Sequence, residues 1–251
     1  MIKCLFIGMF SVSFILLSGC TNSDNGKNIT AENSDKTDST KNEYSEYLTE
    51  LELRKIPSEL IPVGYSIFEK IEGDLNKDGL MDSIIIIKRI NEENIINDEY
   101  RGELDRNRRG ILVFLDKEDN WELASQNLSC FSSENEDGGI YYPPELSVNV
   151  QKGNLYIHYA HGRYGQWKYT FRFQHGYFEL IGYDSSVNYG PIVNSETSIN
   201  FLSKKKLLRE NVNENAEGNG DEIFEDTWEN IEVKQLIKLS EIENFDELDL
   251  L

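Results

Sequence analysis

The sequence predicts a mainly β domain, either an antiparallel sandwich or a partial, propeller-like sheet, with a short helix in front of it. Apolar residues recur at every second position through much of residues 57–205, and short turn sequences separate these runs. About 208 residues follow the polar N-terminal stretch, which is enough for one sizeable core. We therefore expect residues 44–251 to form a single domain, with two smaller domains as the alternative.

The first nineteen residues have the form of an export signal. Lys3 precedes an apolar run over residues 4–17, which is too short for a comfortable membrane span. The run ends in LSGC at 17–20, which resembles the lipobox of bacterial lipoproteins. The resemblance implies cleavage before Cys20 and acylation of its thiol, with palmitate as the label for the attached lipid. Two acyl chains would anchor the mature chain stably at a membrane of the cell envelope, outside the cytoplasm. An ordinary secretory signal with a chance cysteine is the alternative.

Residues 21–43 are polar throughout, with no aromatic residue and almost no apolar one. Such a stretch cannot bury a core, so we expect a flexible tether between the lipidated Cys20 and the domain. A coil of this length reaches roughly 25–30 Å. The sequence does not distinguish a Gram-negative from a Gram-positive source.

The chain is strongly acidic, with a formal net charge of −20. Removal of residues 1–19 would take one lysine and no acidic residue, which makes the mature chain more negative still. This charge argues against nucleic acid and anionic lipid head groups as partners and would attract cations or a basic protein. A solvated surface that keeps the protein soluble is the favoured explanation of this charge. Of the three cysteines only Cys130 would remain free, so we expect no intrachain disulfide and a buried thiol.

The elements follow from the spacing of apolar residues. Residues 44–55 carry apolar and aromatic side chains at helical spacing, and Pro57 and Pro62 end this helix. The continuous apolar runs at 83–87 and 111–115 predict strands that are covered on both faces. Later strands alternate, and the apolar residues of each strand share one face: Leu146, Val148 and Val150; Leu155, Ile157 and Tyr159; Trp167, Tyr169, Phe171 and Phe173, opposite Lys168, Thr170 and Arg172; Phe178 and Leu180; and Ile199 and Phe201. The alternation favours the core for the set from Trp167 to Phe173.

Short polar sequences between these runs are typical of hairpin turns, which makes the sheet mostly antiparallel. They are Asp78-Gly79, Lys117 to Asn120, Lys152 to Asn154 and His175-Gly176. Residues 211–227 are acidic and polar and predict a loop, whereas residues 231–239 predict the last strand. The C-terminal residues would either pack or fray.

One segment has the spacing of a cation-binding loop. Residues 74–82 read DLNKDGLMD, with Asp74, Asn76, Asp78 and Asp82 at positions one, three, five and nine and glycine at six. Ca²⁺ prefers six to eight oxygen ligands, and the carbonyl of Leu80 would supply a further one. The position where an EF-hand needs an acidic residue is held by an isoleucine, so a helix-loop-helix is excluded. The loop therefore predicts a structural Ca²⁺ site, with an acidic hairpin turn as the alternative.

This loop resembles the DxNxDGxxD calcium loops of FG-GAP and VCBS repeats, which join two strands. Those repeats build propellers from several copies, and this chain has one clear copy. A wider resemblance combines GDLNKDGLMD, ILVFLDKEDNWELASQN, Gly138-Gly139 and YTFRFQHGYFELIGYD. It covers most of residues 57–205 and is similar to a family of uncharacterised bacterial lipoproteins. The family carries no activity that could be transferred to this chain.

Other residues give weaker signals. Tyr164, between two glycines in an aromatic-rich stretch, is the best candidate for an exposed contact with a ligand. The three histidines, His158, His161 and His175, are not spaced as metal ligands and are interpreted as structural or surface residues. No catalytic motif is found, so catalytic residues are not assigned.

These observations favour a calcium-stabilised binding or interaction module, anchored in the cell envelope, with an unknown protein or glycan partner. An extracellular hydrolase or carbohydrate-binding protein is the first alternative. An envelope immunity or inhibitor lipoprotein, whose negative charge would suit a basic toxin, is the second.

Overall fold

The computed structural model describes residues 58–136 and 143–251, which belong to one compact unit of the chain, Lys55–Leu251. The expected export signal, Cys20, the expected tether and the expected helix over 44–55 lie outside the described residues. Within the described ranges, no helix has the length and apolar character needed to cross a membrane. The predicted mainly β, antiparallel architecture is confirmed.

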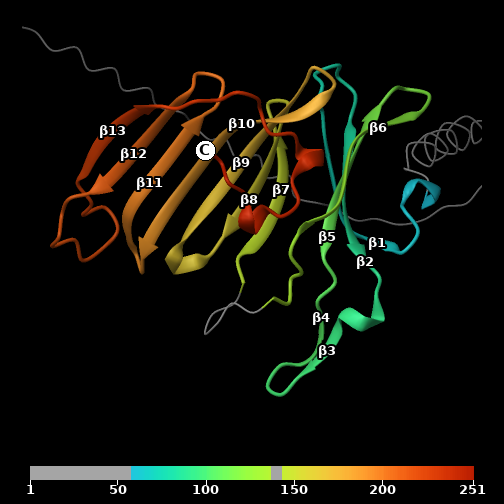
Figure 1. The fold of residues 1–251 in the computed structure, drawn as a ribbon, viewed down its shortest axis with the longest axis horizontal. Coiled ribbons are helices and arrows are strands. Elements are labelled where there is room, and N and C mark those ends of the chain that lie inside the picture. The colour runs from blue at the N-terminus through green and yellow to red at the C-terminus, as the bar shows by residue number, and fades with distance from the viewer. Residues whose placement is uncertain (1–57, 137–142) are drawn as a thin grey trace, which may run out of the picture. The chain divides into compact units, whose positions relative to one another are not determined.

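A four-stranded antiparallel sheet is formed by the first half of the described chain (Figure 1). Its order is β1 (Tyr65–Gly73), β2 (Asp82–Arg89), β5 (Arg109–Asp116) and β6 (Trp121–Phe131). A separate hairpin of β3 (Ile95–Asp98) and β4 (Gly102–Asp105) is inserted between β2 and β5. The predicted turns at Asp78-Gly79 and Lys117 to Asn120 join the strands of this sheet.

A seven-stranded antiparallel sheet follows, in which every strand pairs with its neighbour in sequence. Its strands are β7 (Glu145–Gln151), β8 (Asn154–Ala160), β9 (Gly165–Gln174), β10 (Tyr177–Tyr189), β11 (Ile192–Asn200), β12 (Lys205–Asn211) and β13 (Phe224–Asn230). The helices of the described residues are all 3-10 turns: η1 (Ser58–Leu60), η2 (Glu92–Asn94), η3 (Gly162–Tyr164), η4 (Leu239–Glu241) and η5 (Phe245–Glu247).

The two sheets share one main core, as a sandwich requires. Ile84 and Ile86 of β2 lie in it with Tyr169 and Phe171 of β9. The alternate residues of β2 and β5 form a second cluster on the opposite face of the four-stranded sheet: Ile85, Ile87, Leu112 and Phe114. The runs at 84–87 and 111–115 are thus buried on both faces, as their continuous apolar sequence predicts.

The sheets also meet where β1 approaches β7. A Cβ atom added to Gly73 would lie 2.5 Å from the Cβ of Val150, which is closer than real side chains approach. Glycine is therefore required here by the close packing of the two strands. This contact holds the start of the 74–82 loop against the seven-stranded sheet.

The C-terminal segment packs rather than frays. Phe245 is 2% exposed, and its ring centroid lies 5.2 Å from Phe131 and 4.9 Å from Tyr169. The buried Asn127 side chain donates from Nδ2 to the carbonyls of Leu239 (2.9 Å) and Ile242 (2.7 Å). Because these contacts involve both sheets, the segment closes the main core.

Two sequence predictions near the C-terminus were wrong. The last strand is β13, which takes in Phe224 to Thr227 of the expected loop, and residues 231–239 form no strand. β13 is an edge strand whose side chains are mostly exposed, so main-chain hydrogen bonds to β12 define it without an apolar period. The apolar side chains of 231–239 instead pack on the core, with one bridge from Lys238 to Glu179.

Candidate functional site

The predicted cation loop connects β1 to β2. Leu75 is 1% exposed and lies in the main core, so the loop is fixed from within. Asp74 accepts the amide of Lys77 on Oδ1 (2.6 Å) and the amide of Gly79 on Oδ2 (3.1 Å). Gly79 has φ +90°, a conformation that favours glycine and turns the chain back toward β2.

The next two oxygen-bearing side chains of the loop repeat this pattern. Asn76 Oδ1 accepts the amide of Asp78 (2.9 Å), and Asp78 Oδ1 accepts the amide of Leu80 (2.9 Å). The amide of Leu80 lowers the pKa of Asp78, so this exposed carboxylate is ionised at neutral pH. Asn76 Nδ2 also donates to Asp78 Oδ2 (2.7 Å), a contact that a cation bound to Asp78 would replace.

Asp82 has a different role in the structure. It is fully buried, and it accepts the amide of Leu75 on Oδ2 (2.7 Å) and the amide of Asp116 on Oδ1 (3.0 Å). Burial raises the pKa of Asp82, against these two hydrogen bonds. Its carboxylate therefore connects the start of the loop to the end of β5 through two hydrogen bonds.

The loop fits a partly hydrated hard cation. Asp74, Asn76 and Asp78 are hydrogen-bonded into the loop without being buried, and each oxygen that accepts one amide keeps a further lone pair. With the carbonyl of Leu80, these groups offer four of the six to eight oxygens that Ca²⁺ prefers, and water would complete the shell. Within the described residues, no three acidic, histidine or cysteine side chains converge closely enough to hold a metal ion, and Asp82 accepts the amide of Leu75 instead.

A second feature lies on the face of the seven-stranded sheet that points away from the main core. Lys168, Thr170 and Arg172 of β9 occupy this face, opposite Tyr169 and Phe171. A cavity of about 360 Å³ opens across five strands of it, and we call it the sheet hollow. Its lining residues are His158, Gln166, Lys168, Asp184, Ser185, Ser186, Glu196, Thr197, Ser198, Leu207 and Arg209.

The polar groups of the sheet hollow are connected across strands. Asp184 lies 3.2 Å from Lys168 Nζ and accepts the hydroxyl of Ser198 (2.7 Å). On the next strands, the Arg209 guanidinium pairs with Glu196 (2.5 Å) and with Asp226 (3.2 Å). The two cations that line the hollow thus each hold a carboxylate in place.

The neighbouring β8–β9 edge of the hollow is formed by His158. Its Nε2 lies 2.9 Å from Gln166 Oε1, and its Nδ1 lies 3.4 Å from Ser147 Oγ. This histidine, interpreted from the sequence as structural or surface, lines the sheet hollow and hydrogen-bonds within it. It lies on the outer face because β8 alternates, with Ile157 and Tyr159 facing the core.

Tyr164, the predicted ligand contact, lies in η3 between β8 and β9. It is half-buried, and its ring centroid is 5.1 Å from that of His161 and 5.9 Å from the Arg163 guanidinium. It does not line the sheet hollow. Its surroundings are those of a turn that packs on itself.

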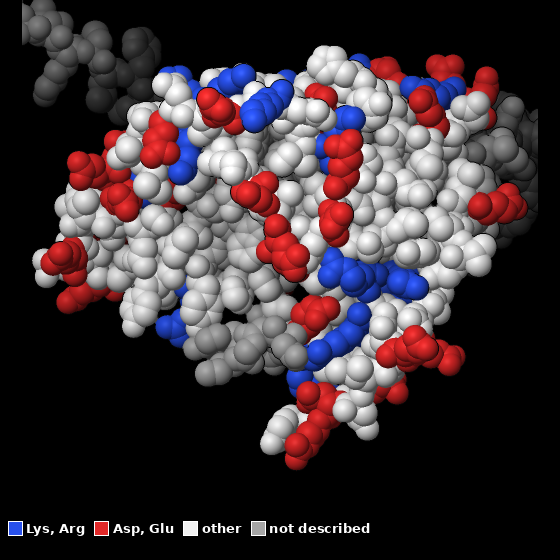
Figure 2. All heavy atoms as spheres, viewed as in Figure 1, with Lys and Arg blue, Asp and Glu red and all other residues white. Residues whose placement is uncertain are grey.

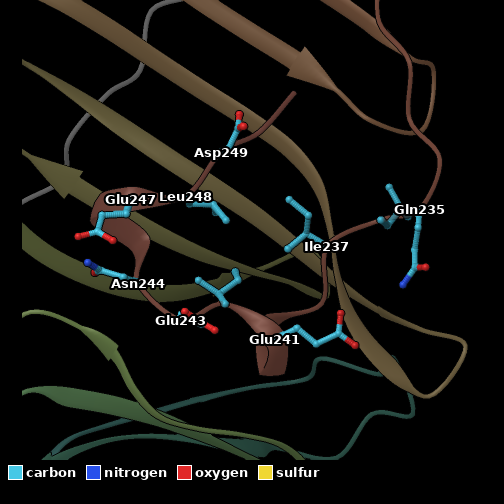
Figure 3. Close-up of a pocket in the computed structure, with 10 residues that line it drawn as sticks. Gln235, Ile237, Glu241, Glu243, Asn244, Glu247, Leu248 and Asp249 are labelled. Carbon is cyan, nitrogen blue, oxygen red and sulfur yellow. The ribbon is translucent and has the colours of Figure 1, made fainter.

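The C-terminal segment forms another cavity, of about 440 Å³, which we call the C-terminal hollow (Figure 3). Four acidic residues line it: Glu241, Glu243, Glu247 and Asp249. All of its lining residues come from one continuous stretch, residues 235–249. Although this cavity is larger than the sheet hollow, its polar groups do not come from separate strands that hold one another in place.

The surface charge is unevenly distributed. On the face seen in Figure 2, acidic side chains are spread widely, and basic side chains gather near the base of the β3–β4 hairpin. Arg108, which lies between β4 and β5, donates from its guanidinium to the carbonyl of Ser129 (2.8 Å) and to Asn244 (3.0 Å). These hydrogen bonds hold part of the C-terminal segment.

The alternation over β9 predicts a polar face from the sequence, but it does not predict which other strands contribute to it. Asp184 and Glu196 were missed because they stand in strands without strong apolar alternation. The pairing of β9 with β10 brings Asp184 opposite Lys168, and the pairing of β11 with β12 brings Glu196 opposite Arg209. Cys20 and its expected lipid lie outside the described residues.

Comparisons with protein-family models, with curated proteins and with solved structures found no match for this chain. The sites above are therefore interpreted from their own chemistry.

Proposed function

We propose that this chain is a lipid-anchored envelope protein that binds a partner through the sheet hollow and takes up structural Ca²⁺ in the 74–82 loop. The observation that carries the binding role is the sheet hollow itself. It is an open polar surface whose hydrogen-bonding groups come from five strands and are held by cross-strand ion pairs. Such a surface suits recognition, because its polar groups are already positioned before a partner arrives.

Recognition is favoured over hydrolysis by the state of the carboxylates. A glycoside hydrolase uses two carboxyl groups as acid and base or nucleophile. In the sheet hollow, Asp184 is held by Lys168 and Ser198, and Glu196 is held by Arg209. Both carboxylates are therefore engaged in contacts within the hollow, which does not suit a catalytic acid or base.

The Ca²⁺ proposal rests on the loop geometry. The side chains of Asp74, Asn76 and Asp78 each accept a backbone amide within one tight loop. The carbonyl of Leu80 follows them in the chain. A hard cation would neutralise the two exposed carboxylates and stiffen the β1–β2 connection. All ligands come from one segment, so the ion would be structural.

Thermal unfolding of the Cys20→Ser mature chain tests the ion. With Ca²⁺ at about 100-fold above Kd, binding stabilises the fold by about 2.7 kcal/mol, which raises Tm by roughly 5–10 °C over the EDTA sample. Asp78→Ala should have the same low Tm in both conditions. Asp119 is an exposed aspartate in the β5–β6 turn, so Asp119→Ala is the matched control and should retain the increase of Tm with Ca²⁺. Equal Tm values with Ca²⁺ and with EDTA, for the chain with an unmodified 74–82 loop, would refute the proposed Ca²⁺ site.

The anchor is tested in a bacterial host with labelled palmitate. The full chain should take up label and sediment with membranes, whereas Cys20→Ser should do neither. A Cys20→Ser variant that fractionates like the original chain would refute lipid anchoring.

The recognition role is tested by sedimentation of the Cys20→Ser mature chain with isolated bacterial envelopes. Lys168→Ala should weaken co-sedimentation because it removes the partner of Asp184 in the sheet hollow. Lys117→Ala is a close control, since both lysines are 39% exposed and pair with a carboxylate on a neighbouring strand. Equal sedimentation of the two variants would show that the hollow is not the binding surface.

An inhibitor of a basic protein is the second candidate, and the C-terminal hollow favours it. Four acidic side chains gather there on a chain of net charge −20. Replacing Glu243 and Glu247 by glutamine would then weaken binding of a cationic partner, with a strong dependence on salt. Binding that is insensitive to salt and to these substitutions would exclude this candidate.

A further inference from the structure

We infer that the ligand of the sheet hollow is a neutral oligosaccharide and that Trp228 is its stacking platform. This inference rests on the proposed function, because it names the ligand class of the same surface. Three properties of the hollow carry it: its balanced charge, its mixture of donors and acceptors, and an exposed indole beside it.

The charge of the hollow is balanced. Lys168 and Arg209 line it with Asp184 and Glu196, and each cation lies within 3.2 Å of a carboxylate. A phosphate or a basic peptide would have to separate one of these pairs and leave its partner without compensation. An uncharged ligand can bind without separating them, although the chain as a whole is strongly acidic.

The hydrogen-bonding groups suit hydroxyl groups. Lysine and arginine offer only donors, carboxylates accept, and serine hydroxyls do both. Gln166 and Ser198 stand among the charged pairs and add groups of both kinds. A sugar hydroxyl is itself donor and acceptor, so it can bridge such neighbours, and hydrogen bonds to charged groups are the stronger ones.

The apolar side of the hollow is formed by Leu207 and continued by Trp228. Leu207 lines the hollow and is paired directly with Trp228 across β12 and β13. Residues paired in this way lie on the same face of a sheet. Trp228 is 63% exposed, so its ring is available to stack on the C–H face of a sugar ring.

The adjacent positions give this platform a rigid frame. The Arg209 guanidinium carbon lies 4.5 Å from the ring centroid of Phe224, on the strand that carries Trp228. Arg209 also donates to Asp226 of the same strand. The edge strand β13 is thus fixed to β12 by side chains as well as by main-chain pairing.

The dimensions favour a chain of sugars over a single one. Neighbouring strands lie about 4.8 Å apart, so the path from β8 to β13 is about 24 Å long. His158 stands at one end of this path and Trp228 at the other. A hexasaccharide laid across the strands would contact both ends.

Calorimetric titration of the Cys20→Ser mature chain with four neutral hexasaccharides tests the inference. The probes are cellohexaose, maltohexaose, mannohexaose and N-acetylated chitohexaose, with hexagalacturonate as the charged probe. At least one neutral probe should bind with Kd below about 1 mM, and hexagalacturonate should bind more weakly. Trp228→Ala and Lys168→Ala should each weaken binding about tenfold, which corresponds to about 1.4 kcal/mol, and Trp228→Phe should restore most of the affinity that Trp228→Ala loses.

Two variants serve as matched controls for this titration. Lys117→Ala has the exposure of Lys168, and Tyr100→Ala removes an aromatic ring that is 90% exposed on the β3–β4 turn. Both should bind the saccharide like the unmodified chain. The inference is wrong if no neutral probe binds, if hexagalacturonate binds most tightly, or if Trp228→Ala and Lys168→Ala have no effect.

Failure of the ligand class can be separated from failure of the surface. If Lys168→Ala abolishes envelope sedimentation while no neutral hexasaccharide binds, the hollow is the recognition surface and its ligand is not a neutral sugar. If Lys168→Ala leaves envelope sedimentation unchanged and no neutral hexasaccharide binds, both the surface and the ligand class are wrong.

Discussion

The two sheets of this protein bury their side chains in opposite ways. In β2 and β5 of the four-stranded sheet, Ile84 to Ile87 and Ile111 to Leu115 are all at most 1% exposed. In the seven-stranded sheet, β9 buries Tyr169 and Phe171 and leaves Lys168, Thr170 and Arg172 half-buried on the other face. A continuous apolar run therefore indicates a strand that is buried on both faces, whereas an alternating strand leaves one face free for recognition.

The largest expected effect separates the core from the open face. Phe245→Ala should reduce the free energy of unfolding by about 3–5 kcal/mol, because it leaves a cavity between Phe131, Tyr169 and Phe171. Trp228→Ala removes a larger ring from an exposed position and should change stability by about 0.5 kcal/mol or less. Urea unfolding measures both, and similar losses for the two variants would remove the distinction between the faces.

An intermediate effect concerns the β3–β4 hairpin, which belongs to neither sheet. Lys88, with a side chain 11% exposed, lies 2.7 Å from Asp105 and 2.5 Å from Glu134. Burial would raise the pKa of Asp105, but hydrogen bonds from Lys88 and Asn107 outweigh it and lower this pKa. Burial would lower the pKa of Lys88, but its contacts with Asp105 and Glu134 outweigh burial and raise this pKa.

These shifts give the pH dependence of the hairpin. A carboxylate with a lowered pKa stabilises the fold above its unfolded value of 3.8 and loses this contribution as pH falls through the folded value. The lysine contributes fully below 10.5 and loses its contribution as pH rises through its higher folded value. Lys88→Met should therefore reduce the protection of amides in residues 95–105 by about 1 kcal/mol at pH 7, and the difference from the unmodified chain should shrink below pH 3.8. Hydrogen exchange measures this, and a difference that does not change with pH would contradict it.

A small effect on stability, comparable to that of Trp228→Ala, is expected at Lys168 in the sheet hollow. Lys168→Ala removes the ion pair with Asp184, whose two side chains are 39% and 49% exposed. The free energy of unfolding should therefore change by less than about 1 kcal/mol. Binding should nevertheless fall, which is the mark of a residue used for recognition rather than for folding. A loss of stability as large as that of Phe245→Ala would make Lys168 a structural residue.

Much of the fold could be predicted from the sequence, because the period of apolar residues reports burial directly. The runs at 83–87 and 111–115 and the turns at Lys117 to Asn120 and His175-Gly176 lie where expected. β13 could not be predicted, since pairing through the main chain needs no apolar period. The packing of the C-terminal segment could not be predicted either, because Ile242, Phe245 and Leu248 stand among acidic residues and do not alternate as the residues of a strand do.

The site was less predictable than the fold. Spacing alone identified the loop around Asp74, Asn76 and Asp78, but it could not reveal that Asp82 is turned inward to the amide of Asp116, 34 residues away. The sheet hollow depends on which strands become neighbours, and Lys168 meets Asp184 only through the register of β9 and β10. Spacing within one strand carries no information on such pairs.

Hydroxyl-radical footprinting of the Cys20→Ser mature chain with isolated bacterial envelopes tests the central claim most directly. If the open face of the seven-stranded sheet is the recognition surface, oxidation of Trp228 and His158 should fall severalfold when envelopes are present. Tyr100, which is 90% exposed on the β3–β4 turn, should react as in the free protein. Protection of Tyr100 or of the C-terminal hollow, with Trp228 and His158 unchanged, would contradict the account.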